Sequence, residues 1–198
     1  MKKIGLFGGT FDPPHIGHTA LARAVLEKFS LDKIIFIPAG NPPHKTDKKV
    51  TDKNHRYEMI RLATVGNPQF LISDFDIKNE KPNYSYITIE HFKCEYPDDE
   101  IFFIVGADSY RDFPKWKNYP EILSLCTFIV VNRDGADVSD CLLKYQKEST
   151  QHKALFLDDF SCDVSSTELR EKLSSGKNCK GCLHESVFEY IKNNGLYN

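Results

Sequence analysis

Two histidines three residues apart, His15 and His18, follow a short apolar segment and two adjacent glycines, Gly8 and Gly9. Adjacent glycines let a backbone pass close to a ligand where a Cβ atom would clash. If a helix begins near Pro14, both imidazoles lie on one face of it and can converge on one group. The start of such a helix offers unpaired N–H groups and partial positive charge. The segment therefore predicts a phosphate-binding site rather than a plain turn.

The sequence VSSTELR, residues 164–170, is a second candidate for phosphate binding. Ser165 and Glu168 have the spacing of a capping box, so we expect a helix to begin there. Its first turn would offer N–H donors, and Arg170 just inside it could hold phosphate oxygens with a planar fork. An ordinary capped surface helix is the alternative, and the first site makes us favour a second phosphate clamp.

The composition limits the partners that such sites can serve. The chain has 198 residues, with 26 basic and 28 acidic side chains and a formal net charge of −2. This balance argues against a broad nucleic-acid-binding surface, so anion recognition should be local. We see neither an apolar stretch of roughly 18 residues for a membrane span nor a signal peptide, which favours the cytoplasm. The six scattered cysteines are then expected as free thiols.

Short apolar runs alternate with segments of helical spacing, and this alternation predicts how the candidate residues are positioned. In residues 18–29, Leu21, Val25 and Phe29 recur every four residues, as in an amphipathic helix. Such alternation predicts an α/β fold, with a mostly parallel sheet covered by helices on both faces. The runs predict strands at 3–7, 33–38, 70–75, 101–105, 127–131 and 154–157, and the other expected helices are 51–65, 86–96 and 138–148.

Loops rich in Pro, Gly and Asn follow several of the predicted strands. They include residues 8–17, 38–49 and 132–137. Ligands of open parallel sheets bind beyond the carboxyl ends of the strands. We therefore expect the loops after the first, second, fourth and fifth strands to form the site.

Several motifs together resemble one known family. The segment GGTFDPPHIGH matches the H-x-G-H signature of nucleotidyltransferases with a Rossmann-like, doubly wound fold, and it most resembles bacterial nicotinate-mononucleotide adenylyltransferases. The resemblance continues in order along nearly the whole chain. It is carried by NPPHK (41–45), FIVGADS (103–109) with Trp116, VNR (131–133), VSSTELR (164–170) and the pattern V-x-x-Y-I-x-x-x-G-L-Y (187–197).

The resemblance implies a single nucleotidyltransferase domain over residues 1–198, with a C-terminal helical part at about 160–198 that carries SSTELR. It also implies a reaction in which ATP and nicotinate mononucleotide give deamido-NAD and pyrophosphate in NAD biosynthesis. The mononucleotide phosphate would attack the ATP α-phosphorus in line, without a covalent enzyme intermediate. Mg²⁺ would arrive with ATP, no metal site of protein ligands is expected, and a homo-oligomer is compatible with the sequence.

The same resemblance assigns roles to individual residues. His15, His18 and Arg170 would be catalytic, and the Trp116 ring would stack on the nicotinate ring. ATP would contact Gly8, Gly9, Thr10, Phe11, His15, His18, Gly106, Asp108, Arg133, Ser165, Ser166, Thr167 and Arg170. Nicotinate mononucleotide would contact Asn41, His44, Lys45, Tyr84, Ser85, Asp108 and Trp116.

One segment departs from the family pattern, and other functions compete with the main interpretation. The family usually has P-S-Y-T-x-x-T-L where this chain has PNYSYITI, residues 82–89, near the expected pyridine carboxylate. Phosphopantetheine adenylyltransferases and cytidylyltransferases share H-x-G-H, and a nucleotide sensor without turnover is a further possibility. Cys179 and Cys182 form a single C-x-x-C, for which two free thiols in a surface loop are favoured over a zinc or redox module.

Overall fold

A parallel β-sheet forms the centre of the computed structural model, which describes residues 1–41, 50–79, 84–132 and 138–198. In these residues six strands pair in the order β3-β2-β1-β4-β5-β6, and each neighbouring pair is parallel. This is the doubly wound order expected of a Rossmann-like fold, so the predicted fold class is confirmed. The strands are β1 (Lys3–Gly9), β2 (Lys33–Pro38), β3 (Phe70–Ile72), β4 (Glu100–Gly106), β5 (Thr127–Val131) and β6 (Lys153–Leu157).

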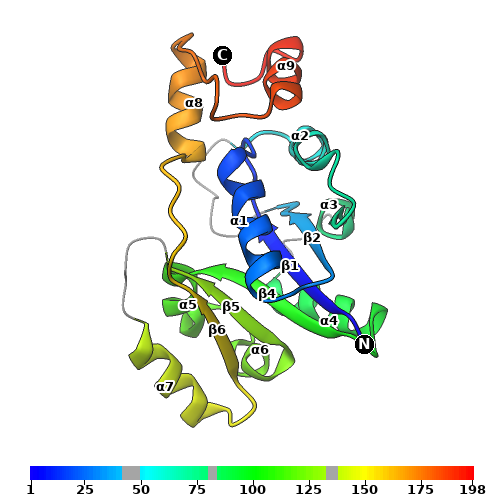
Figure 1. Cartoon of the computed structure of the whole chain (residues 1–198), viewed down its shortest axis with the longest axis vertical. Helices are drawn as coiled ribbons and strands as arrows, with labels where there is room; N and C mark the ends of the chain where they lie inside the picture. Colours follow the sequence, from blue (N-terminus) through cyan, green and yellow to red (C-terminus); the bar gives the residue numbers. More distant parts are fainter. Residues whose placement is uncertain (42–49, 80–83, 133–137) are drawn as a thin grey trace.

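Helices cover both faces of the sheet, because side chains along each strand point alternately to opposite faces. On β1, for example, Leu6 belongs to one apolar core and Phe7 to the other. The core containing Phe7 includes residues of α1 (Ile16–Lys28), α2 (Lys53–Thr64), α8 (Ser166–Ser174) and α9 (Glu185–Asn193). In Figure 1, α8 and α9 lie above α1 and α2, beyond the end of the sheet. The core containing Leu6 is covered by α4 (Ser85–Glu95), α5 (Ala107–Arg111), α6 (Tyr119–Leu125) and α7 (Ser139–Glu148).

Most of the predicted elements are present, but one strand is shorter than expected. β3 ends at Ile72, because the chain turns into the short helix α3 (Phe75–Lys78) instead of continuing to residue 75. The Ser73 hydroxyl accepts a hydrogen bond from the Phe75 N–H at 3.1 Å and so stabilises that turn. The short helices α3, α5 and α6 and the 3₁₀ helix Phe113–Lys115 were not predicted, whereas α9 lies within the helical part expected at about 160–198. None of the described helices is long and apolar enough to cross a bilayer.

The start of the second loop touches α3 so closely that only glycine fits there. A Cβ atom on Gly40 would lie 2.1 Å from the carbonyl oxygen of Asp76. Main-chain atoms cannot move aside as a flexible side chain can. Gly40 therefore determines how closely the chain leaving β2 packs against α3.

We expect Gly40→Ala to lower the free energy of unfolding by about 1–3 kcal/mol, because the methyl group overpacks this contact. Urea unfolding followed by circular dichroism measures the change. Gly106→Ala is the matched control, since its Cβ would meet no described atom within 4 Å. The control should stay within about 1 kcal/mol of wild type, and equal losses in the two variants would contradict the prediction.

Candidate functional site

The two histidines of the first loop lie face to face at the start of α1. His15 is the N-cap residue and His18 the third helical residue, so the helix begins two residues later than predicted. Their ring centroids are 3.8 Å apart, and the two rings are tilted by 37°. The main-chain N–H of His15 donates a hydrogen bond to the ring Nδ1 of His18 at 3.1 Å. Because Nδ1 accepts, the neutral His18 ring carries its proton on Nε2.

The residue before His18 is a glycine, Gly17, because the helix start is crowded. A Cβ atom on Gly17 would lie 2.5 Å from Sγ of Cys162 and 2.9 Å from Nδ1 of His15. His15 itself is 3% exposed, and the His18 ring packs edge-on against Phe11 with centroids 5.0 Å apart. The imidazoles are therefore held by packing on several sides.

Helix α8 brings the second candidate segment to the first loop. Ser165 is its N-cap and accepts from the Glu168 N–H at 3.2 Å, as the sequence predicts. The Ser166 hydroxyl donates to the Pro13 carbonyl at 2.9 Å. Arg170 donates to the Asp12 carbonyl at 2.6 Å and to the Thr167 hydroxyl at 3.1 Å. The two motifs, far apart in the sequence, thus form one cluster.

A cavity of about 490 Å³ opens where the strand order reverses, between β1 and β4. Gly8 and Gly9 line it at the end of β1, and Gly106 lines it at the end of β4. The crevice at such a reversal is the usual ligand site of doubly wound sheets. The predicted residues Thr10, Tyr84, Ser85 and Trp116 also line this cavity.

Trp116 and the start of α4 form the far wall of the cavity. Trp116 is half-buried against Phe113, with ring centroids 4.8 Å apart. The Nζ atom of Lys117 lies 4.6 Å from the centroid of the Tyr84 ring. Tyr84 is the N-cap of α4, so the positive end of that helix lies at the cavity wall.

Other predicted site residues lie elsewhere or cannot be placed. Phe11 is 2% exposed and packs in the core between Phe7 and Phe36. The Asp108 side chain is 92% exposed, pairs with Arg111 at 3.0 Å and is not among the residues that line the cavity. Asn41 is exposed, whereas His44, Lys45 and Arg133 lie outside the described residues.

Comparison with known proteins identifies the family. A family model described as cytidylyltransferase-like matches residues 6–172. A probable nicotinate-nucleotide adenylyltransferase of Clostridium tetani is 43% identical over 100% of both chains. The nicotinate-nucleotide adenylyltransferase of Bacillus subtilis is 42% identical over 100% of this chain and 99% of its own. The chain belongs to the nicotinate-nucleotide adenylyltransferase family. It is therefore a nucleotidyltransferase.

Solved structures agree with this family assignment at the level of the fold. The nicotinic acid mononucleotide adenylyltransferase of Plasmodium falciparum, complexed with NaAD, superposes with a TM-score of 0.80 at 19% identity. The match covers 100% of this chain and 98% of that one. A putative nicotinate-nucleotide adenylyltransferase from Vibrio parahaemolyticus matches with a TM-score of 0.70 at 22% identity, over 100% and 96% of the two chains.

In this family member, sequence reasoning missed a buried arginine beside the first loop. Arg56 is 1% exposed and donates to three carbonyl groups, those of Thr10 at 2.8 Å, Gly40 at 2.9 Å and Thr51 at 2.8 Å. Burial lowers the pKa of the Arg56 guanidinium, and the nearby Asp12 carboxylate opposes that shift. In the sequence, an arginine in the amphipathic helix α2 is expected to face solvent. Only its contacts in the structure show that Arg56 is buried beside the first loop.

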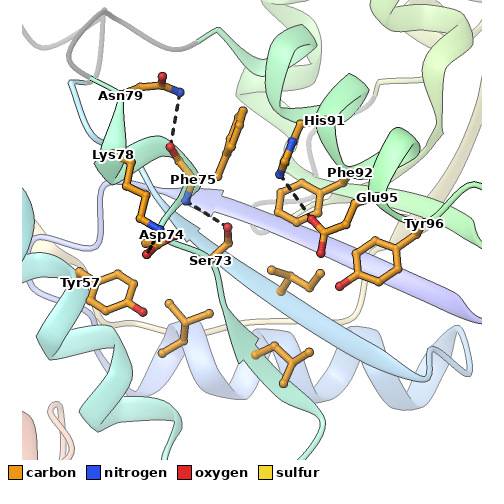
Figure 2. Close-up of a pocket in the computed structure, with 13 residues that line it drawn as sticks. Tyr57, Ser73, Asp74, Phe75, Lys78, Asn79, His91, Phe92, Glu95 and Tyr96 are labelled. Carbon is orange, nitrogen blue, oxygen red and sulfur yellow. Dashed lines mark hydrogen bonds and ion pairs between the residues drawn. The ribbon is translucent and has the colours of Figure 1, made fainter.

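A second cavity, about 560 Å³ in volume, lies at the β3 edge of the sheet and contains none of the predicted site residues. Figure 2 shows that polar side chains in it already pair with one another. His91 lies 3.3 Å from Glu95, and Lys78 lies 2.9 Å from Asp74. The cavity between β1 and β4 is therefore the candidate active site of this adenylyltransferase-family chain.

The C-x-x-C segment forms a turn next to α1 whose two central residues are exposed, as expected of a surface loop, but one of its two cysteines is buried. Cys179 is 1% exposed, and its carbonyl accepts from the Cys182 N–H at 3.0 Å. The Cys182 carbonyl in turn accepts from the Ile16 N–H at 3.1 Å, at the first residue of α1. Both cysteines are free thiols. In the part of the chain that the structure describes, no group of three or more His, Cys, Asp or Glu side chains could hold a metal ion.

His184 connects this part of the chain to α1 and makes stability depend on pH. Its Nε2 atom lies 2.8 Å from the Thr19 hydroxyl, and burial lowers the pKa of the His184 ring below its usual value of 6.5. The unfolded chain therefore binds a proton here more readily than the folded chain does. Stability from this group is complete above about pH 6.5 and is lost as the pH falls below that value.

We expect the free energy of unfolding of wild type to fall more steeply between about pH 7.5 and pH 5.5 than that of His184→Gln, which has no proton to gain there. Urea unfolding at the two pH values measures both slopes. Identical slopes would show that protonation of His184 is not coupled to folding.

Proposed function

We propose that this protein transfers the AMP moiety of ATP to nicotinate mononucleotide, which gives deamido-NAD and pyrophosphate in NAD biosynthesis. One observation carries the proposal: the cavity at the strand reversal joins the glycine loop to Trp116 and the start of α4, and the His15–His18 pair and Arg170 meet at the same loop. A triphosphate needs N–H donors and positive charge, as at the glycine loop, and a pyridine ring needs an aromatic surface such as Trp116. The whole of residues 1–198 would act as one nucleotidyltransferase domain.

The reaction needs no protein nucleophile. The 5′-phosphate of the mononucleotide is already nucleophilic at neutral pH and attacks the α-phosphorus of ATP while pyrophosphate leaves on the opposite side. Catalysis then consists of alignment and stabilisation of charge on the transferring group. His18 can donate its Nε2–H to a phosphoryl oxygen, and His15 stacks against it at the helix start.

The start of α8 would hold the outer phosphates. Arg170 already has one guanidinium nitrogen on the Asp12 carbonyl and one on Thr167, so its fork is oriented before any ligand binds. Ser165, Ser166 and Thr167 present main-chain N–H groups at the same helix start. Mg²⁺ accompanying ATP would neutralise charge on the triphosphate oxygens.

The two halves of the substrate pair would contact residues in and beside the cavity. For the adenosine half we propose the backbone of Gly8, Gly9, Thr10 and Phe11 together with Gly106, Asp108 and Arg133. For the mononucleotide we propose stacking on Trp116 and N–H groups near Tyr84 and Ser85 for the pyridine carboxylate. Asn41, His44 and Lys45 would hold its phosphate, and Asp108 a ribose hydroxyl.

A substrate panel with ATP tests the proposed function. We expect pyrophosphate release with nicotinate mononucleotide, and a kcat/KM for nicotinamide mononucleotide lower by roughly 10-fold or more, because the start of α4 offers donors suited to a carboxylate. Phosphopantetheine should give no turnover. Comparable kcat/KM values for the two pyridine mononucleotides would refute the carboxylate preference, and turnover of phosphopantetheine alone would refute the function.

His18→Ala should lower kcat by roughly 10²-fold, the usual effect of removing one donor that stabilises transition-state charge. Steady-state pyrophosphate release measures the loss. His91→Ala, a histidine of α4 in the cavity of Figure 2, is the control and should keep wild-type turnover. Near-wild-type turnover in His18→Ala would overturn the role given to that ring.

A further inference from the structure

The hydroxyl of Tyr197, in the segment after α9, reaches the loop that carries the histidine pair. It donates to Oδ1 of Asp12 at 2.6 Å, and the Thr51 side chain hydrogen bonds to the same hydroxyl. Burial and the Asp12 charge raise the pKa of the Tyr197 hydroxyl far above its usual range, so the donor proton stays in place at neutral pH. None of the functional roles proposed above uses this tyrosine.

The backbone at Tyr197 indicates that its position is held by contacts with other parts of the chain. Its φ angle is 65°, in the left-handed region that bulky residues seldom adopt. Such a conformation persists where surrounding contacts hold it, and it occurs often near functional sites. The hydrogen bond to Asp12 is one such contact.

Asp12 transmits this contact to the candidate catalytic cluster. The residue is 4% exposed, and its other carboxylate oxygen accepts from the Thr51 N–H at 3.3 Å. Its main-chain carbonyl accepts the 2.6 Å hydrogen bond from Arg170. A shift of Asp12 therefore moves the anchor of the Arg170 guanidinium directly. It also moves Pro13, whose carbonyl accepts from the Ser166 hydroxyl.

We propose that Tyr197 is a positioning residue, which acts through Asp12 to hold Arg170 and the start of α8 against the histidine loop. The inference rests on the proposed function, because Arg170 is taken to bind the triphosphate. Tyr197 contacts no substrate in this scheme. Removing its hydroxyl leaves Asp12 with the Thr51 N–H and with the nearby charge of Arg56, so the chain keeps its fold while Arg170 loses its exact placement.

Tyr197→Phe tests the proposal, with Tyr190→Phe as the matched control. The Tyr190 hydroxyl makes a hydrogen bond of similar kind, 2.8 Å from Nδ1 of His55, but it links α9 to α2 away from Asp12. We expect Tyr197→Phe to lower kcat for deamido-NAD formation by about 10-fold and to change both KM values by less than about 3-fold, because a displaced Arg170 stabilises the transition state less. Tyr190→Phe should keep the wild-type kcat.

A double-mutant cycle tests whether the effect passes through Asp12. Asp12→Ala removes the acceptor of the Tyr197 hydrogen bond but keeps the main-chain carbonyl. If the two residues act through one contact, the kcat of the double variant should be no more than about twofold below that of the worse single variant. If the fold-losses in kcat of the two single variants multiply in the double variant, Tyr197 does not act through Asp12.

Two further outcomes separate the inference from the proposed function. A Tyr197→Phe enzyme with wild-type kcat, or equal losses in the Tyr197 and Tyr190 variants, would overturn the inference and leave the function intact. Absence of turnover by wild type with nicotinate mononucleotide would overturn the function and, with it, the inference.

Discussion

Three hydrogen bonds from Arg56 to main-chain carbonyls connect the first loop to residues at either end of the second. The guanidinium joins Thr10 in the first loop to Gly40 at the start of the second loop and to Thr51 just after it. A charge buried this deeply is costly unless all its hydrogen bonds are made. Moving Thr10 away from Gly40 and Thr51 would therefore break hydrogen bonds of a buried cation.

Glycines allow close main-chain contacts at two places around the candidate site. Gly40 lets the chain touch α3, and Gly17 lets α1 begin beneath Cys162. Where backbones approach closely, main-chain carbonyl oxygens come within reach of charged side chains. Arg56 donates to the carbonyl of Gly40, and Arg170 donates to that of Asp12. The site is thus preorganised largely by main-chain groups, whose positions do not depend on rotamers.

Much of the fold could be predicted from the sequence, because the strands are apolar runs and the longer helices have clear periodicity. The end of β3 could not, since Ser73 stops the strand through a local side-chain hydrogen bond that the apolar run FLISDF conceals. The capping box and Arg170 of VSSTELR indicated a second phosphate clamp, but its hydrogen bonds to Asp12 and Pro13 left no pattern in the sequence. Asp12 and Arg56 were missed because their importance lies in burial and in partners distant along the chain, and neither property leaves a local pattern.

The two apolar cores lie under different halves of the site. The core that contains Phe7 supports α1 and α8, and so the histidine pair and Arg170. The core that contains Leu6 supports α4 and the ring of Trp116 on the opposite face of the sheet. The strands β1 and β4 contribute side chains to both cores and separate one core from the other. On the proposed function, repacking the core under Trp116 would change the ring that is accepted while leaving the His15–His18 pair and Arg170 on the other core, so that substrate choice and bond formation could vary independently.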